Sequence, residues 1–124
     1  MTEEKFTYYM TGRNIDTTDV KEVKDFSKSD KVLEVKNLSA KGFEHVSFDL
    51  HAGEILGIAG QLGSGRTELS LALFGMLKPT NGNISVSGET VHLKNVAEAQ
   101  KNGIALVPED RLTEGLFLPQ SIYK

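Results

Sequence analysis

The chain has 124 residues, no cysteine and a formal net charge of -3 at pH 7. This length allows one small domain, and the acidic balance gives no electrostatic reason to expect nucleic acid as a partner. The lack of cysteine excludes disulfides, thiol catalysis and cysteine-based zinc sites, and because the apolar runs are far shorter than the roughly 20 residues that span a bilayer, we expect a soluble protein.

Composition changes near residue 31. Residues 1–30 are rich in charge, hold few apolar side chains and contain a single glycine, so they are predicted to form an arm or linker. Within residues 31–124, alternating or apolar positions predict strands over 31–35 and 46–50. Ile55–Ala59 is an almost continuous apolar run, which is typical of a buried central strand.

Further elements follow in the second half of the chain. Apolar residues recur at helical spacing over 69–77, before Lys78 and Pro79 end the helix. Two short antiparallel strands are predicted over 84–87 and 91–93.

A second helix begins at a cap formed by Asn95 and Glu98 and stops before Gly103. Ile104–Val107 is predicted as another short buried strand, closed by Pro108. Together these elements predict an α/β domain with a mixed sheet.

The chemistry is concentrated between the run 55–59 and the first helix. The segment reads G-Q-L-G-S-G-R-T, the spacing of a phosphate loop with arginine in place of the usual lysine. Glycines let successive N–H groups converge on a phosphate, and the following helix adds its positive end. The plain alternative is a glycine-rich turn before a helix. The candidate phosphate-binding residues are Gly60, Gln61, Leu62, Gly63, Ser64, Gly65, Arg66, Thr67 and Glu68.

Two side chains of this loop carry specific expectations. Arg66 can hold phosphate bidentately but is bulkier than lysine, and alternatively it pairs with a surface acid such as Glu68. Thr67 supplies a hydroxyl for Mg²⁺. A second acid for Mg²⁺ would be Glu109 or Asp110, unless these residues only form a charged turn.

The aromatic and imidazole side chains suggest less. Phe43 is either a platform that stacks on a nucleotide base or, more simply, a turn residue that covers the sheet. The three histidines are scattered without helical pairing, so we expect no metal site at them: His45, His51 and His92.

Several of these segments together resemble one family. Residues 53–69, the run 103–111 with its Pro-Glu-Asp-Arg end, and Glu114–Leu116 are similar to the second nucleotide-binding half of bacterial sugar-import ABC ATPases of the ribose, galactose and xylose type. Met10–Arg13 resembles the segment that closes the first half in those proteins.

The resemblance implies a partial ABC-type nucleotide-binding domain, with an antiparallel β-subdomain and a phosphate-loop strand–helix unit. ATP and Mg²⁺ are the implied ligands, and Glu109 falls where the family has the glutamine of its glutamine loop. Residues 1–30 would be the linker from the first half. Residues 31–124 would be the front portion of the second, ending before the signature loop and the acidic strand end, so that the chain is a fragment.

The implied partners are the first ATPase half and a membrane permease contacted near Glu109–Ile122, at the inner face of the cell membrane. We expect ATP binding that energises sugar import in the parent complex, and no hydrolysis by this piece alone. The alternatives are a non-hydrolytic scaffold half and an unrelated small phosphate-loop NTPase or kinase. Uncovered apolar faces that include Leu69, Leu73 and Leu106 also predict self-association.

Overall fold

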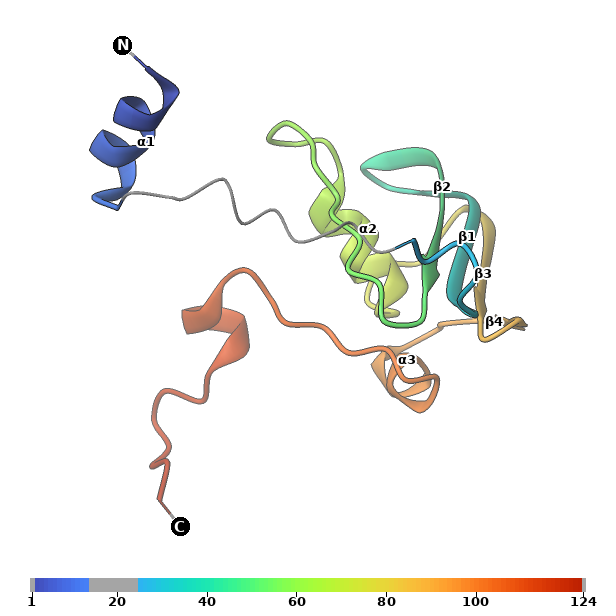
Figure 1. Ribbon diagram of the computed structural model, residues 1–124. Coiled ribbons are helices and arrows are strands. Elements are labelled where there is room, and N and C mark those ends of the chain that lie inside the picture. The colour runs from blue at the N-terminus through green and yellow to red at the C-terminus, as the bar shows by residue number, and fades with distance from the viewer. Residues whose placement is uncertain (1, 14–24, 124) are drawn as a thin grey trace.

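The computed structural model describes residues 2–13 and 25–123. No helix in these described residues combines the length and the apolar character that a bilayer crossing requires. In chain order (Figure 1), the elements are α1 (Glu3–Thr11), β1 (Lys31–Ala40), β2 (Phe43–His51), α2 (Arg66–Leu73), β3 (Asn81–Val86), β4 (Glu89–Val91), α3 (Val96–Lys101) and the π-helical turn η1 (Arg111–Gly115).

The four strands form one antiparallel sheet in the order β2-β1-β3-β4. A tight hairpin joins β1 to β2, with Ala40 paired to Phe43. The strands expected over 31–35 and 46–50 are confirmed within β1 and β2. The strand expected over 84–87 overlaps β3, which ends at Val86, and β4 ends at Val91 and not at residue 93.

A bulge in β1 decides which side chains reach the core. The pairing with β2 shifts between Val35 and Leu38, and Asn37 between them has a φ of 50°. The backbone N–H of Asn37 donates to Ser47 Oγ at 2.8 Å, which anchors the bulged strand to its partner. Because the extra residue breaks the alternation of faces, Val35 and Leu38 are both buried, each 1% exposed.

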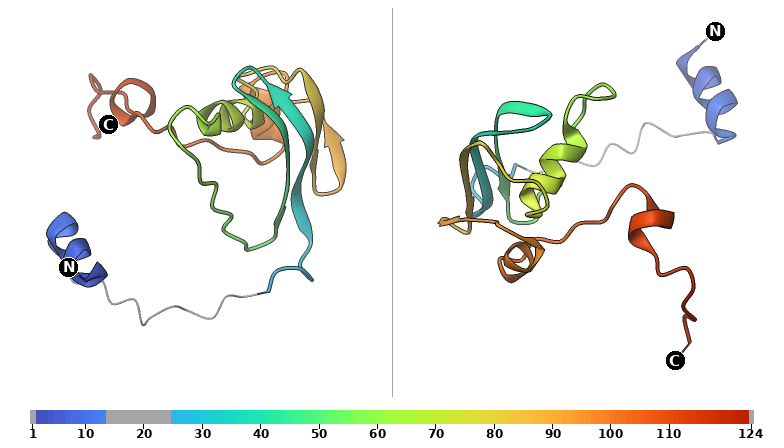
Figure 2. Two further views of the ribbon diagram at one scale, coloured as in Figure 1. Left: turned by 90° about the horizontal axis from the view of Figure 1, so that it is seen from above. Right: turned by 180° about the vertical axis from the view of Figure 1, so that it is seen from behind.

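Helices cover one face of the sheet. Figure 2 shows α2 and α3 on the same side of the sheet, and the core lies between these layers. It is formed by Val35, Leu38, Ala40, Phe43, Leu69, Ala72, Ile84, Leu93 and Ala99. Leu69 is only 4% exposed, so the expectation of an uncovered Leu69 is wrong.

Helix α2 is shorter than expected. It ends at Leu73 and not at residue 77, because Gly75 adopts a left-handed φ of 76°. A Cβ at Gly75 would lie 2.7 Å from the carbonyl carbon of Asn95, so the turn after α2 packs directly on the start of α3. This contact stops the helix before Lys78 and Pro79 are reached.

The predicted cap of α3 is confirmed. Asn95 Oδ1 accepts the N–H of Glu98 at 3.0 Å, and the Glu98 carboxylate accepts the N–H of Lys94 at 3.0 Å. Gly103 follows the helix with a φ of 79°, as its role as a stop requires.

The mixed sheet is not observed. Residues 55–59 and 104–107, both predicted as buried strands, belong to no strand of the sheet. Ile55 is 96% exposed and Val107 is 91% exposed. A buried parallel strand needs hydrogen-bonded neighbours on both sides, and the described residues supply none for either run.

The segment before β1 holds a helix that its composition did not predict. The rings of Tyr8 and Tyr9 on α1 meet edge to face at 6.0 Å between centroids, and Tyr9 is 77% exposed. Helix α1 stands away from the sheet and its covering helices in all views (Figures 1 and 2). No described residue of α1 belongs to the hydrophobic core.

Candidate nucleotide-binding site

The glycine-rich loop runs directly into α2. Gly63 and Gly65 have φ values of 78° and 88°, which a residue with a side chain adopts only with strain. Within the loop, Ser64 N–H donates to the Gln61 carbonyl at 3.1 Å. Gly65 caps α2, and its carbonyl accepts the N–H of Leu69 at 2.8 Å. The two left-handed residues thus turn the chain sharply from the loop into the helix.

The start of α2 presents unpaired donors. Within the described residues, no acceptor takes the backbone N–H groups of Gly65, Arg66 and Thr67. The first N–H groups of a helix lack intrahelical acceptors, and together with the helix dipole they favour an anion. This end of α2 can therefore receive phosphate oxygens without any change of fold.

Close backbone contacts fix the position of the loop. A Cβ at Gly65 would lie 2.8 Å from Phe43 Cβ and would overlap the Gly42 carbonyl. Gly42 in turn has a φ of 101°, and a Cβ there would lie 2.8 Å from Cγ of Glu68. The tip of the β1–β2 hairpin is thus wedged against the start of α2, and Glu68 packs on the hairpin.

The loop also closes on itself at its first residue. A Cβ at Gly60 would overlap the Ser64 hydroxyl and would lie 3.5 Å from Arg66 Cδ. The first residue of the loop thus lies directly against the Ser64 side chain at its far end.

A cavity of about 400 Å³ adjoins the start of α2. It brings together Arg66, Thr67 and Glu109, which are far apart in sequence. Their shared cavity combines a guanidinium, a hydroxyl and a carboxylate. The lining residues are Ile58, Arg66, Thr67, Ser70, Leu71, Leu106, Val107, Pro108, Glu109 and Glu114.

Arg66 makes no ion pair among the described residues, so the alternative pair with Glu68 is not formed. Its side chain lines the cavity, and its Cδ lies near Gly60. The guanidinium is thus left for a ligand.

Asp110 has a different role from its neighbour Glu109. Its Oδ1 accepts the N–H groups of Leu112 and Thr113, at 2.9 and 3.2 Å, and its Oδ2 accepts the Thr113 hydroxyl at 2.6 Å. These bonds, the hydroxyl first, hold the pKa of the Asp110 carboxyl below its ordinary value. Asp110 does not line the cavity, so of the two acids only Glu109 faces it.

Other predicted site residues lie elsewhere. Leu62 is fully exposed at the tip of the loop, where only its backbone could meet a ligand. Phe43 is 7% exposed within the core, so its ring cannot stack on a base here and instead covers the sheet, as the simpler interpretation held. Within the described residues, no group of three acidic or imidazole side chains could hold a metal ion.

Sequence reasoning missed two cavity residues with oxygen-bearing side chains, the hydroxyl of Ser70 and the carboxylate of Glu114. Ser70 lies one helical turn after Thr67, a spacing that could have indicated it, and its hydroxyl donates to the Arg66 carbonyl at 3.1 Å. Glu114 reaches the cavity only through the fold of η1, for which the sequence carries no comparable signal.

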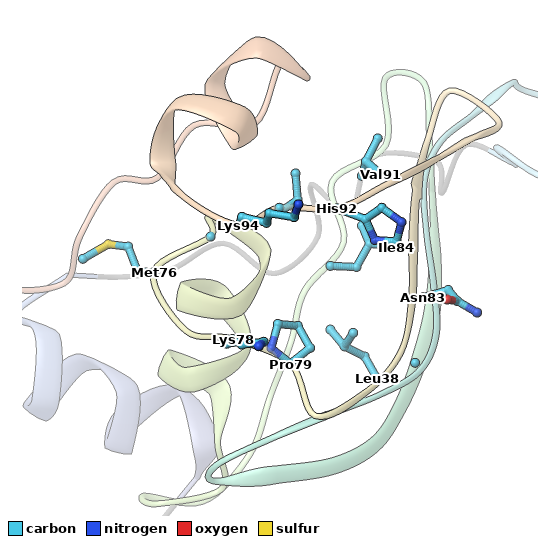
Figure 3. Close-up of a pocket in the computed structure, with 12 residues that line it drawn as sticks. Leu38, Met76, Lys78, Pro79, Asn83, Ile84, Val91, His92 and Lys94 are labelled. Atoms are coloured by element: carbon cyan, nitrogen blue, oxygen red, sulfur yellow. The ribbon is translucent and has the colours of Figure 1, made fainter.

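A second, larger cavity of about 560 Å³ lies between the turn that follows α2 and the strands β3 and β4 (Figure 3). Lys78, His92 and Lys94 line it together with the apolar side chains of Leu38 and Ile84. None of the predicted phosphate-loop residues lines this cavity. Because its lining is basic, this cavity is an alternative binding site for a polyanion, in competition with the start of α2.

Comparison with known proteins places these features in context. Residues 43–121 match the family described as ABC transporter. The chain is 46% identical over 120 residues to the ribose import ATP-binding protein RbsA of Clostridium perfringens, over 96% of this chain and 24% of that protein. It is 39% identical over 141 residues to the ribose import ATP-binding protein RbsA of Bacillus subtilis, over 96% of this chain and 28% of that protein.

A third relative is a ribose/galactose/methyl galactoside import ATP-binding protein of Hahella chejuensis. It is 43% identical over 123 residues, over 98% of this chain and 24% of that protein. The chain thus spans about a quarter of the length of these curated relatives.

Proposed function

The chain belongs to the ABC transporter family, and we propose that it is the front portion of the second ATP-binding half of a sugar-import ATPase. In this proposal residues 60–67 hold the phosphates of Mg-ATP, and residues 1–30 form the linker from the first half. The similarity to ribose import ATP-binding proteins supports the sugar class. The family match also removes the alternative of an unrelated phosphate-loop enzyme.

One observation carries the proposal. Arg66 and Thr67, whose backbone N–H groups are unpaired among the described residues, line the same cavity as Glu109. The loop packs closely at two glycines, Gly60 and Gly65, because a Cβ at either position would overlap neighbouring atoms. Unpaired N–H groups at the start of a helix, together with the helix dipole, favour a phosphate group at this position.

The side chains fit a magnesium ion that accompanies the nucleotide. Thr67 offers a hydroxyl oxygen and Glu109 a carboxylate oxygen to the same cavity, and oxygen donors are what Mg²⁺ prefers. When bound, the ion would neutralise charge on the phosphates. Arg66 would then hold phosphate oxygens with its planar guanidinium, which binds bidentately and is bulkier than an ammonium.

The assignment to the second half rests on the resemblance of residues 53–69 and 103–116 to that half. Two side chains depart from the usual pattern of a nucleotide site. Arg66 stands where lysine is usual, Glu109 stands where the resembling family has glutamine, and Met10–Arg13 resembles the end of a first half. The same departures favour the alternative of a scaffold half that binds nucleotide without turnover. We expect no hydrolysis by the 124-residue chain, because its sequence has no match to the catalytic glutamate and switch histidine of the family.

The proposed partners are the first ATPase half and a membrane permease, at the inner face of the membrane. Segment 109–122 is proposed to face the permease. Its apolar side chains support this, since Leu112 is 65% exposed, Phe117 is 81% exposed and Leu118 is 62% exposed.

Calorimetric titration of the purified chain with ATP tests the proposal. We expect saturable binding with Mg²⁺ and weaker binding without it, whereas AMP, which lacks the β- and γ-phosphates, should give no heat of binding. Replacing Arg66 by Lys should alter the affinity without producing phosphate release. Equal binding of AMP and ATP would contradict a site built for phosphates, and turnover by the Arg66→Lys variant would contradict the need for further family loops.

A further inference from the structure

Asp110 is bound into its own turn more completely than any other carboxylate near the site. Its two oxygens accept three hydrogen bonds, two from Thr113 and one from Leu112, and its backbone carbonyl accepts the N–H of Glu114 at 3.2 Å. A side chain engaged in this way has little left to offer a ligand. It caps η1 as an aspartate caps the start of a helix.

The two ends of the capped turn, Pro108 and Gly115, lie close together. A Cβ at Gly115 would lie 3.4 Å from Pro108 Cγ, so the segment from Pro108 to Gly115 folds back on itself. As a result, Glu109 and Glu114, which lie on either side of Asp110 in sequence, both line the cavity that holds Thr67.

We propose that Asp110 is a positioning residue of the nucleotide site: its cap on η1 holds the carboxylates of Glu109 and Glu114 at the cavity that they share with Thr67. The inference rests on the proposed function, since the two carboxylates matter only if Mg-ATP occupies the cavity. Asp110 itself does not touch the ligand. Loss of the cap would release the turn and withdraw both acids from the metal side of the site.

The test compares three variants of the full chain by calorimetric titration with ATP, with and without Mg²⁺. Asp110→Ala removes the cap, Thr113→Val removes the hydroxyl that donates to it, and Asp110→Asn keeps a capping oxygen. We expect Asp110→Ala to weaken Mg-ATP binding about fivefold, the factor that corresponds to the typical loss of about 1 kcal/mol when a cap is removed. Thr113→Val should weaken it less, and Asp110→Asn should keep most of the affinity.

The Mg²⁺ dependence separates positioning from general damage. Binding of ATP without Mg²⁺ should be unchanged in Asp110→Ala, because the N–H groups of residues 65–67 do not depend on the turn. Unaltered amide spectra of β1 would show that the variants remain folded. Equal losses with and without Mg²⁺, or no loss in Asp110→Ala, would overturn this inference alone. Failure of the unsubstituted chain to bind ATP at all would overturn the proposed function and this inference together.

Discussion

Gly42 and Gly65 pack backbone against backbone where the β1–β2 hairpin meets the start of α2. A Cβ on Gly65 would overlap the Gly42 carbonyl, and Gly65 itself is buried. The phosphate loop is therefore held in place by the tip of the antiparallel sheet. Side chains cannot replace these glycines without moving one of the two elements.

We predict that Gly65→Ala destabilises the fold more than Gly88→Ala does. Both glycines have left-handed φ values, 88° and 84°, but the space around Gly88 is open. Placing alanine at a left-handed φ costs each variant roughly 1–2 kcal/mol of stability. Gly65→Ala loses about 1–3 kcal/mol more, because its Cβ overlaps neighbouring atoms. Urea unfolding monitored by circular dichroism measures the difference. Equal midpoints for the two variants would mean that the contact with Gly42 is unimportant.

An ion-pair cluster on the sheet should make stability depend on pH. Lys31 Nζ lies 2.7 Å from Asp49 Oδ2 and 3.2 Å from Glu34 Oε1, and Lys36 Nζ lies 2.7 Å from Glu34 Oε2. A hydrogen bond from Lys31 lowers the pKa of Asp49, and one from Lys36 lowers that of Glu34. The bond to Asp49 raises the pKa of Lys31.

The sign of the effect follows from these directions. The carboxylates stabilise the fold above their ordinary pKa values, and this stability is lost as the pH falls through the lowered native values. Lys31 contributes below its ordinary pKa, and its contribution is lost as the pH rises through the raised value. Asp49→Asn should flatten the acid limb of a stability–pH curve, whereas Glu44→Gln, which removes an exposed carboxylate without an ion pair in the described residues, should not. An unchanged acid limb in Asp49→Asn would contradict the role of the cluster.

Hydrogen exchange should divide the chain into two classes. We expect slow exchange in β1, which is hydrogen-bonded to strands on both sides, and fast exchange in α1 and in residues 55–59. Amide exchange followed by NMR measures this directly. Protection of residues 55–59 equal to that of β1 would show that this run is a buried strand in solution after all.

We predict that the chain self-associates through its uncovered apolar runs. Ile55, Ile58 and Val107 lie outside the sheet with exposed side chains. Apolar surface of this kind favours association or strand addition. Light scattering should show a mass that rises with concentration and falls in Val107→Asp, with Thr90→Asp on β4 as the control. A single monomeric mass over the whole concentration range would be incompatible with this prediction.

Sequence reasoning succeeded where structure is decided locally. The Asn95 cap depends on neighbours a few residues away and was predicted, and parts of β1 and β2 were predicted as strands from their alternating side chains. The runs 55–59 and 104–107 have the composition of central strands, but such strands depend on distant partners that composition does not specify. Gly75 ends α2 early because of a contact with Asn95, which no local pattern announces.

The candidate site likewise contains residues that a local motif indicates and residues that only the folded structure brings into place. The spacing of the glycines and Thr67 predicts a phosphate loop, since the chemistry requires those residues in that order, and this stays a prediction. The roles of Gly42, Asp110 and Glu114 could not be predicted, because each arises from a contact or a turn geometry and not from a motif. Phe43 was ambiguous in the sequence, and only its burial decided between its two interpretations.

The most direct test of the account is to map bound ATP onto the backbone. Two-dimensional amide NMR of the labelled chain, titrated with Mg-ATP, should shift the N–H signals of Gly63, Gly65, Arg66 and Thr67 first and most strongly. The signals of Lys78 and Lys94, at the basic cavity of Figure 3, should stay in place. Shifts confined to Lys78 and Lys94, with the loop from Gly63 to Thr67 unmoved, would contradict a phosphate site at the start of α2.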